Sequence, residues 1–201
     1  IGSNDGGSAY TAFLKIAMIN WKTNLGDFSI GMQNMNMFKT MENTWGHRFI
    51  RKMSMDLYGF SPSADLGIGL TRRFGMIQTS ALITNGGGYK TIEDDEHKKL
   101  SLHMVYGNSK LNKEEGFNLG GSFSLEPYNQ LDESKVENKK VLGVFSGFSG
   151  FGFRGGLEHD RKWTNNRLNS TITSFYGTYT FSEKVSFLGR IDKVDYNNTF
   201  F

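Results

Sequence analysis

Apolar and polar residues alternate with a period close to two along almost the whole chain, which strongly limits its possible folds. In residues 64–71, for example, Leu66, Ile68 and Leu70 alternate with Gly67 and Gly69. This period places successive side chains on opposite faces of a β-strand, so the chain is predicted to be all-β. The predicted strands are about ten in number and span residues 10–22, 27–34, 63–71, 75–85, 99–107, 116–126, 140–148, 150–161, 169–181 and 184–194.

The connections between these strands alternate in length. Short connections are expected at 22–27, 72–75, 108–115, 149–150 and 182–184, and long ones at 35–62, 86–98, 127–139 and 162–168. Short turns at one end and long polar loops at the other are typical of outer-membrane barrels. We therefore expect an antiparallel up-and-down transmembrane β-barrel in the cell outer membrane of a Gram-negative-type bacterium. A soluble ligand-binding β-barrel shows the same alternation and stays an alternative.

The composition agrees with this class and excludes others. A mean hydropathy of −0.44 does not argue against a membrane barrel, because such a barrel needs apolar residues only at every second strand position. The chain lacks cysteine, so it has no disulfide framework and no thiolate metal site. A formal net charge of +3 is too small to indicate a nucleic-acid partner.

The order of the connections also bears on completeness. If the long loops are external, the first strand begins outside and the tenth ends outside. Bacterial single-chain barrels begin and end on the periplasmic side. We therefore expect residues 1–201 to be a single β-barrel domain that is incomplete at both ends.

Four stretches resemble the phosphate-selective porin O/P family of outer-membrane β-barrel porins. They are ENTWGHRFIRK (42–52), SPSADLGIGL (61–70), ITNGGGYK (83–90) and FYGTYTFSEKVSFLGRID (175–192). The resemblance implies a water-filled channel built from about sixteen strands, of which this chain would be an internal fragment. It also implies a homotrimer surrounded by outer-membrane lipid and lipopolysaccharide, and a loop 35–62 that folds into the barrel and narrows it.

Charged residues on the polar strand faces and in loop 35–62 are the candidate site. The basic candidates for lining or narrowing the pore are Lys15, Arg154 and Arg190 on strands, and Lys39, Arg48, Arg51 and Lys52 in the loop. The acidic residues on polar faces are Asp65, Glu126, Glu158 and Asp192, so the predicted lumen is mixed in sign. The loop carries Glu42 and Asp56 as well, which leaves it two positive charges in excess. A basic constriction would concentrate anions, whereas the alternative is an ordinary solvated loop.

No catalytic site can be assembled from the sequence. The four histidines lack metal-ligand spacing, and no G-x-S-x-G nucleophile motif occurs. Glu158 and Asp160 lie on one strand face, where lumenal charges explain them more simply than a catalytic pair. We therefore expect no enzyme, no metal and no cofactor.

One glycine-rich string resembles a nucleotide loop. Residues 150–155, GFGFRG, match G-x-G-x-x-G, but no helix is predicted after them to hold a pyrophosphate. We instead predict a tight hairpin turn at Ser149–Gly150, with Arg154 facing the lumen.

These observations predict an outer-membrane porin for passive diffusion of small solutes, with anions as candidates. A structural or adhesive outer-membrane barrel that works through its external loops is the alternative. A membrane-embedded enzyme would need a Ser/His/Asp set on the outer rim, and none is evident.

Overall fold

Ten antiparallel strands form a single sheet in the computed structural model, which describes residues 14–90, 96–129 and 136–197. The strands are β1 (Ala17–Thr23), β2 (Gly26–Asn34), β3 (Ala64–Phe74), β4 (Ile77–Thr84), β5 (Lys99–Gly107), β6 (Gly116–Asn129), β7 (Val136–Gly150), β8 (Phe153–Thr164), β9 (Arg167–Ser182) and β10 (Val185–Tyr196). Each strand pairs with the next along the chain, in the order β1 to β10. The predicted all-β class, the up-and-down order and the strand number are therefore confirmed.

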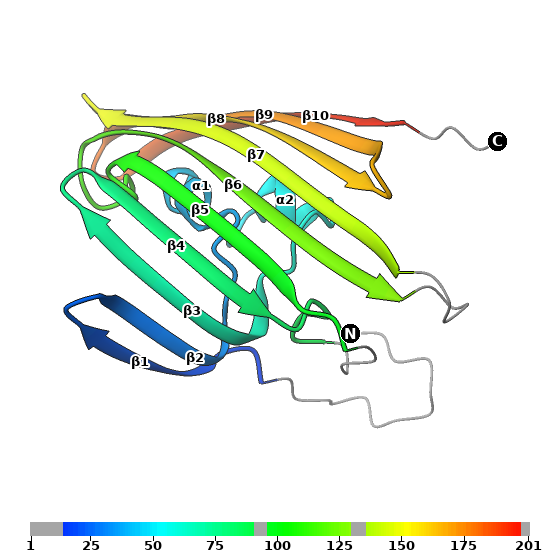
Figure 1. Cartoon of the computed structure of the whole chain (residues 1–201). Coiled ribbons are helices and arrows are strands. Elements are labelled where there is room, and N and C mark those ends of the chain that lie inside the picture. Colours follow the sequence, from blue (N-terminus) through cyan, green and yellow to red (C-terminus); the bar gives the residue numbers. More distant parts are fainter. Residues whose placement is uncertain (1–13, 91–95, 130–135, 198–201) are drawn as a thin grey trace, which may run out of the picture.

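The sheet curls so that it has a concave inner face and a convex outer face (Figure 1). The strand register places the large apolar side chains on the outer face, where they are exposed. Examples from β2 to β10 are Ile30, Ile68, Ile83, Met104, Leu119, Val144, Leu157, Phe175, Phe187 and Ile191. The inner face carries smaller and more polar residues, as the period of two predicts. Among the described residues, no pairing joins β10 to β1, so the sheet is open.

The strands of the second half are longer than predicted. β6 ends at Asn129 and β7 begins at Val136, so most of the long connection expected at 127–139 belongs to these two strands. The prediction of a long connection at 162–168 was wrong, because β8 and β9 continue to a two-residue turn at Asn165–Asn166. Both asparagines have a positive φ, of 51° and 64°, a conformation that asparagine tolerates better than most residues.

The hairpin predicted at Ser149–Gly150 was misplaced by two residues. β7 continues through Gly150, which pairs with Phe153, and the turn consists of Phe151 and Gly152. Their φ angles are 55° and 76°, as a two-residue hairpin turn that matches the twist of the strands requires.

Lys15 does not lie on a strand, although it was predicted within a strand spanning 10–22. β1 begins at Ala17, and residues 1–13 lie outside the described part of the chain. The Lys15 ammonium is 5.2 Å from the centre of the Tyr89 ring, and Tyr89 lies beyond the end of β4.

The connection between β2 and β3, residues 35–63, folds back over the concave face, and we call it the inner loop (Figure 1). It contains two short helices, α1 (Lys39–Trp45) and α2 (Ser54–Leu57), which the period-two pattern did not predict. The helical signal was nonetheless present, because Met41 and Trp45 are spaced four residues apart and share one face of α1.

The hydrophobic core lies between the inner loop and the sheet. The loop contributes Met37, Phe38, Met41, Trp45, Met53, Met55 and Phe60, and the strands contribute Val105, Val141, Phe145, Ile172 and Tyr176. Glycines on the inner face of β7 allow this close approach. A Cβ at Gly143 would lie 2.4 Å from the Met55 methyl, and one at Gly147 would lie 2.9 Å from the Thr44 methyl. The core therefore belongs to one half of the sheet, formed mainly by β6–β10.

Candidate functional site

The space enclosed by the curved sheet is the candidate site, and the inner loop divides it. Arg154 on β8 holds the C-terminal end of α1. Its Nε donates to the carbonyl of Thr44 at 2.9 Å, and its Nη2 donates to the carbonyl of Trp45 at 3.4 Å. A guanidinium at this end of a helix satisfies carbonyls that have no partner within the helix. Arg154 faces inward as predicted, but it binds the inner loop.

His47 lies beside Arg154 in the inner loop. Its Nε2 is 2.8 Å from the Thr178 hydroxyl on β9 and 3.5 Å from Nη2 of Arg154. Burial, and then the charge of Arg154, lower the pKa of the His47 imidazole below its usual value of 6.5. His47 is therefore a neutral hydrogen-bonding group at neutral pH.

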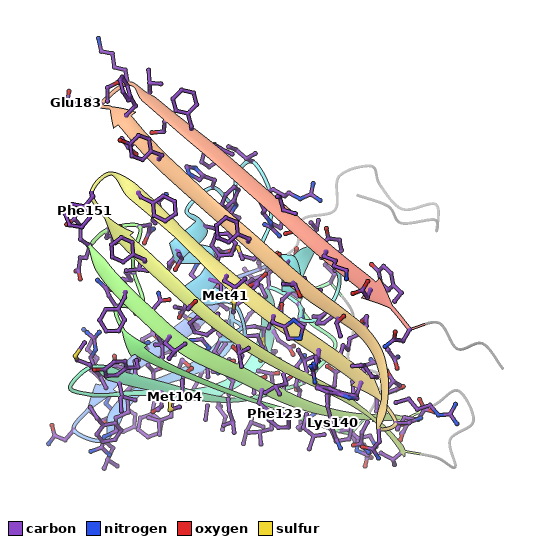
Figure 2. All side chains as sticks on the ribbon, turned by 90° about the horizontal axis from the view of Figure 1, so that it is seen from above. Met41, Met104, Phe123, Lys140, Phe151 and Glu183 are labelled. Atoms are coloured by element: carbon purple, nitrogen blue, oxygen red, sulfur yellow. The ribbon has the colours of Figure 1, made fainter. Side chains whose placement is uncertain are left out.

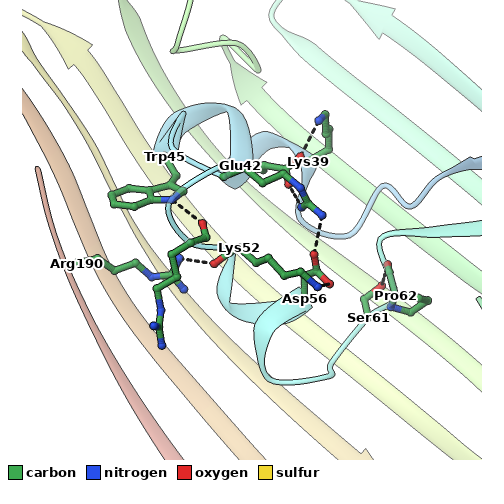
Figure 3. A network of polar contacts seen from close by, with 10 residues as sticks. Lys39, Glu42, Trp45, Lys52, Asp56, Ser61, Pro62 and Arg190 are labelled. Carbon is green, nitrogen blue, oxygen red and sulfur yellow. Dashed lines mark hydrogen bonds and ion pairs between the residues drawn. The ribbon is translucent and has the colours of Figure 1, made fainter. Parts of the chain in front are cut away.

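Arg190 on β10 contacts the start of α2 (Figure 3). Its Nη1 donates to the carbonyl of Lys52 and its Nη2 donates to the hydroxyl of Ser54, both at 2.6 Å. Its Nε donates to a carboxylate oxygen of Asp192 at 2.7 Å. The hydroxyl of Tyr58 donates to the same carboxylate at 3.2 Å. Arg190 therefore links β10 to the inner loop through the Lys52 carbonyl and the Ser54 hydroxyl.

The four basic residues predicted in the inner loop are brought close to carboxylates. Lys39 is 2.6 Å from Glu42, which also accepts a short hydrogen bond from Arg48. Asp56 lies 3.0 Å from Arg48 and 3.5 Å from Lys52 (Figure 3). Burial opposes the charge of Arg48, but Glu42 and Asp56 outweigh it and raise the pKa of the guanidinium.

The remaining basic residue of the loop, Arg51, is half exposed. Its Nε is 3.9 Å from the Asp192 carboxylate. Lys39, Arg48 and Lys52 therefore share one ion-pair network with Glu42 and Asp56, whereas Arg51 pairs separately with Asp192. The charges of all four predicted loop residues are thus partly neutralised.

The acidic residues predicted on the polar strand faces are also engaged or covered. Glu126 bridges Lys99 at 2.9 Å and Lys139 at 3.1 Å. Asp65 accepts hydrogen bonds from the backbone amides of Leu66 and Gly86. The carboxylates of Glu126 and Asp65 are thus paired with lysines or backbone amides.

Glu158 and Asp160 are fully buried on the inner face of β8, beneath the inner loop. Glu158 lies next to Ser54 of the inner loop. The Asp160 carboxylate and the buried hydroxyl of Tyr176 have no hydrogen-bond partner among the described residues. The Asp160 carboxylate lies over Gly143, where a Cβ would be 2.5 Å away. These two carboxylates therefore belong to the filled half of the interior and do not line an open space.

The other half of the interior, along β1–β5, contains a hollow of about 620 Å³. Amides line much of it, including Asn20, Asn36, Asn43 and Gln78. Its charged residues are four lysines and one aspartate: Lys22, Lys39, Lys110, Lys113 and Asp27. The hollow is therefore polar and carries an excess of positive charge.

His103 marks the boundary between the hollow and the filled half. Its ring nitrogens lie 2.9 Å from the hydroxyls of Thr40 on α1 and Ser122 on β6. Its ring also stacks on Phe145, with centroids 5.4 Å apart. His103 thus holds α1 against the wall and faces the hollow on its other side.

Three of the lysines that line the hollow were missed by sequence reasoning. Lys22 alternates with the outward Trp21 at the end of β1, so the period of two was enough to identify it. Lys110 and Lys113 lie in the 108–115 turn, which folds inward: the side-chain amide of Asn43 on α1 donates to the Ser109 carbonyl at 2.9 Å. Leu111 in this turn is buried, an apolar signal that the sequence contained.

Comparisons with known proteins find a likeness in structure but none in sequence. No family model matches the chain, and no curated protein does. A solved structure that is similar to it is OmpT, in-vitro folded, an outer membrane protein of Vibrio cholerae in its trimer form. The two chains are 13% identical, the match covers 96% of this chain and 72% of that one, and the TM-score is 0.47. Among the described residues, no helix has the length and apolar character to cross a membrane.

Proposed function

We propose that the chain forms the wall and the inner loop of an outer-membrane β-barrel channel, through which small solutes diffuse passively. One observation carries the proposal: the sheet is apolar on its convex face and polar around a hollow on its concave face. This is the polarity of a barrel whose outside meets lipid and whose inside holds water.

The same polarity argues against a soluble ligand-binding barrel. Such a barrel buries its apolar face inside and exposes its polar face to water. In this chain large apolar residues are exposed on the outer face of every strand, and Ile19 and Ile191 are each 73% exposed. A soluble protein rarely exposes an apolar surface that extends across a whole sheet.

The hollow supports a passage beside the inner loop. The loop fills the β6–β10 half, so solutes would pass along β1–β5, past the amides and lysines described above. Positive charge on a low-dielectric wall raises the local concentration of anions, so small anions are the favoured solutes. Passive diffusion requires no catalytic residue, metal or cofactor. Assembly as a homotrimer and contact with lipopolysaccharide stay predictions.

Planar-bilayer recordings of the purified full-length protein test the proposal. We expect open-channel conductance whose reversal potential in a KCl gradient indicates a preference for anions. Replacing Lys22, Lys110 and Lys113 together by glutamate should shift the reversal potential toward cations, because six units of charge change along the hollow. The control is Lys193→Glu, which changes an exposed lysine paired with Asp195 on β10 and should leave selectivity unchanged.

The outcomes separate the alternatives. Absence of conductance in a folded preparation would favour a structural or adhesive barrel. If the triple variant conducts with an unchanged reversal potential, these lysines do not line the passage. A protein that stays soluble without detergent would contradict the membrane location itself.

A further inference from the structure

A groove crosses the outer face of the sheet between β3 and β7. It has a volume of about 520 Å³, and its rim consists of large apolar residues, among them Leu70, Leu102, Met104, Phe123 and Leu142. Met104 and Phe123 lie on the convex side in Figure 2, whereas Met41 lies on the opposite side, within the curve of the sheet. The groove and the hollow therefore lie on opposite faces of the sheet, and Ser80 and His103 border both.

Two small outward residues create this groove. Ala81 on β4 stands between Leu70 and Leu102 in the strand register, and Gly121 on β6 stands between Met104 and Val144. Large side chains surround both positions, so the outer surface is hollowed there. Within a bilayer, such a hollow offers an acyl chain contacts on several sides instead of one.

An unpaired cation lies at one end of the groove. Arg72 faces outward on β3, two residues before the strand ends at Phe74, and its guanidinium carbon is 4.5 Å from the centre of the Phe74 ring. No salt bridge to Arg72 occurs within residues 14–90, 96–129 and 136–197. An arginine stacked on an aromatic ring next to a turn is placed at the depth of lipid headgroups, if the strands span the bilayer.

From this arrangement we infer that the outer face binds one phospholipid, with an acyl chain in the groove and the phosphate on Arg72. The inference rests on the proposed membrane location. An apolar groove alone would not select a headgroup, because all lipid tails are equally apolar. Arg72 supplies the selection, since a guanidinium forms charge-assisted, bidentate hydrogen bonds with a phosphate. The short turn after β3 is predicted to be periplasmic, so the ligand is a phospholipid of the inner leaflet.

Native mass spectrometry of the detergent-purified protein tests this inference. The probes are phosphatidylethanolamine and a diacylglycerol with the same acyl chains, which lacks the phosphate. We expect one tightly bound phosphatidylethanolamine for each chain and at least tenfold weaker binding of the diacylglycerol. Arg72→Gln should weaken phosphatidylethanolamine binding by a similar factor. The matched control is Arg73→Gln, which changes the neighbouring arginine on the opposite face of the strand.

A second pair of variants tests the groove. Ala81→Leu fills it and should weaken binding of both probes. Gly189→Leu adds the same apolar bulk to the outer face of β10, where an added Cβ would meet no atom within 4 Å, and should change neither. Equal binding by the Arg72 and Arg73 variants, or by the Ala81 and Gly189 variants, would overturn the inference. It would also be overturned if Ala81→Leu changed the oligomeric state but not lipid binding, because the groove would then hold a second copy of the chain.

Conductance measured on the same preparations separates this inference from the proposed function. Channels that conduct but retain no phospholipid would contradict only the lipid site. A protein that retains the phospholipid but does not conduct would contradict only the channel.

Discussion

The two halves of the interior differ although one continuous sheet forms both. Along β6–β10 the inward residues include Val141, Phe145, Ile172 and Tyr176, and the inner loop packs on them. Along β1–β5 they are mostly polar, such as Asn20, Ser29 and Gln78, and a hollow remains. The strand pattern is the same in both halves, so the kind of inward residue decides where the loop docks and where a passage stays open.

The anchoring groups strengthen this difference. Arg154 and Arg190 both lie in the filled half, and both donate to main-chain carbonyls of the inner loop. Arginines on an inner wall are readily interpreted as pore-lining charges, but here their positions serve attachment. Among the described residues, Lys22, Lys110 and Lys113 make no comparable contacts with the helices. Lys39, itself on α1, pairs with Glu42.

The largest effect is expected when the filled half loses its central side chain. Trp45→Ala removes a buried ring that packs edge-on against Tyr176 with centroids 5.9 Å apart, and it should destabilise the docked loop by about 3–5 kcal/mol. We expect single-channel conductance to rise and proteases to cut within the loop. Phe49→Ala is the control, because Phe49 in the same loop is 84% exposed. If both variants gave the same conductance as the wild type, docking would not depend on this core.

A smaller effect should isolate the Arg154 anchor. Gly46 has a φ of +72°, and a Cβ there would lie 2.5 Å from Nη2 of Arg154. Gly59 has a φ of +68°, and a Cβ there would meet nothing within 4 Å. Alanine at either site carries a similar backbone cost, about 1–2 kcal/mol. Gly46→Ala should cost about 1 kcal/mol more, because Arg154 must move away from its carbonyl partners.

Denaturant unfolding of the two alanine variants measures this difference. In an Arg154→Ala background the difference should disappear, as a double-mutant cycle would reveal. If the two alanine variants still differ in free energy of unfolding in the Arg154→Ala background, the extra cost arises from the backbone at Gly46.

The smallest effect concerns pH. Because the folded state lowers the pKa of His47, its contribution to stability is present above about pH 6.5 and is lost as pH falls through the folded pKa. Docking of the inner loop should therefore weaken slightly below pH 6.5, which protease sensitivity as a function of pH would detect. His47→Gln keeps a hydrogen-bonding group without titration and should flatten this part of the profile. An unchanged profile would assign the acid sensitivity to other groups.

Much of the sheet could be predicted from the sequence, because the period of two is a local property of each strand. The strand order followed, as did the inward direction of Arg154 and Arg190. The turn at Asn165–Asn166 was missed because the polar residues around it were interpreted as loop rather than as strand ends. The inner loop was expected to be polar, but its five methionines, Met35, Met37, Met41, Met53 and Met55, indicated burial.

The interior itself could not be predicted, since it depends on contacts between distant parts of the chain. The partners of Arg190 lie 136 and 138 residues away, at Ser54 and Lys52. No local pattern indicates that the 108–115 turn brings its lysines to the hollow beside α1. The charge candidates were therefore of the right kind, but their partners and the open side of the interior required the structure.

The long separation of these contacts has a consequence for the order of assembly. The inner loop follows β2 in the chain, yet it is held by Arg154, Thr178 and Arg190, which lie on β8, β9 and β10. Contacts between residues so far apart form late, because long loops must close before such contacts can contribute. The methionines and Trp45 consequently stay uncovered while the earlier strands pair. The interior should then narrow only after β8–β10 are in place.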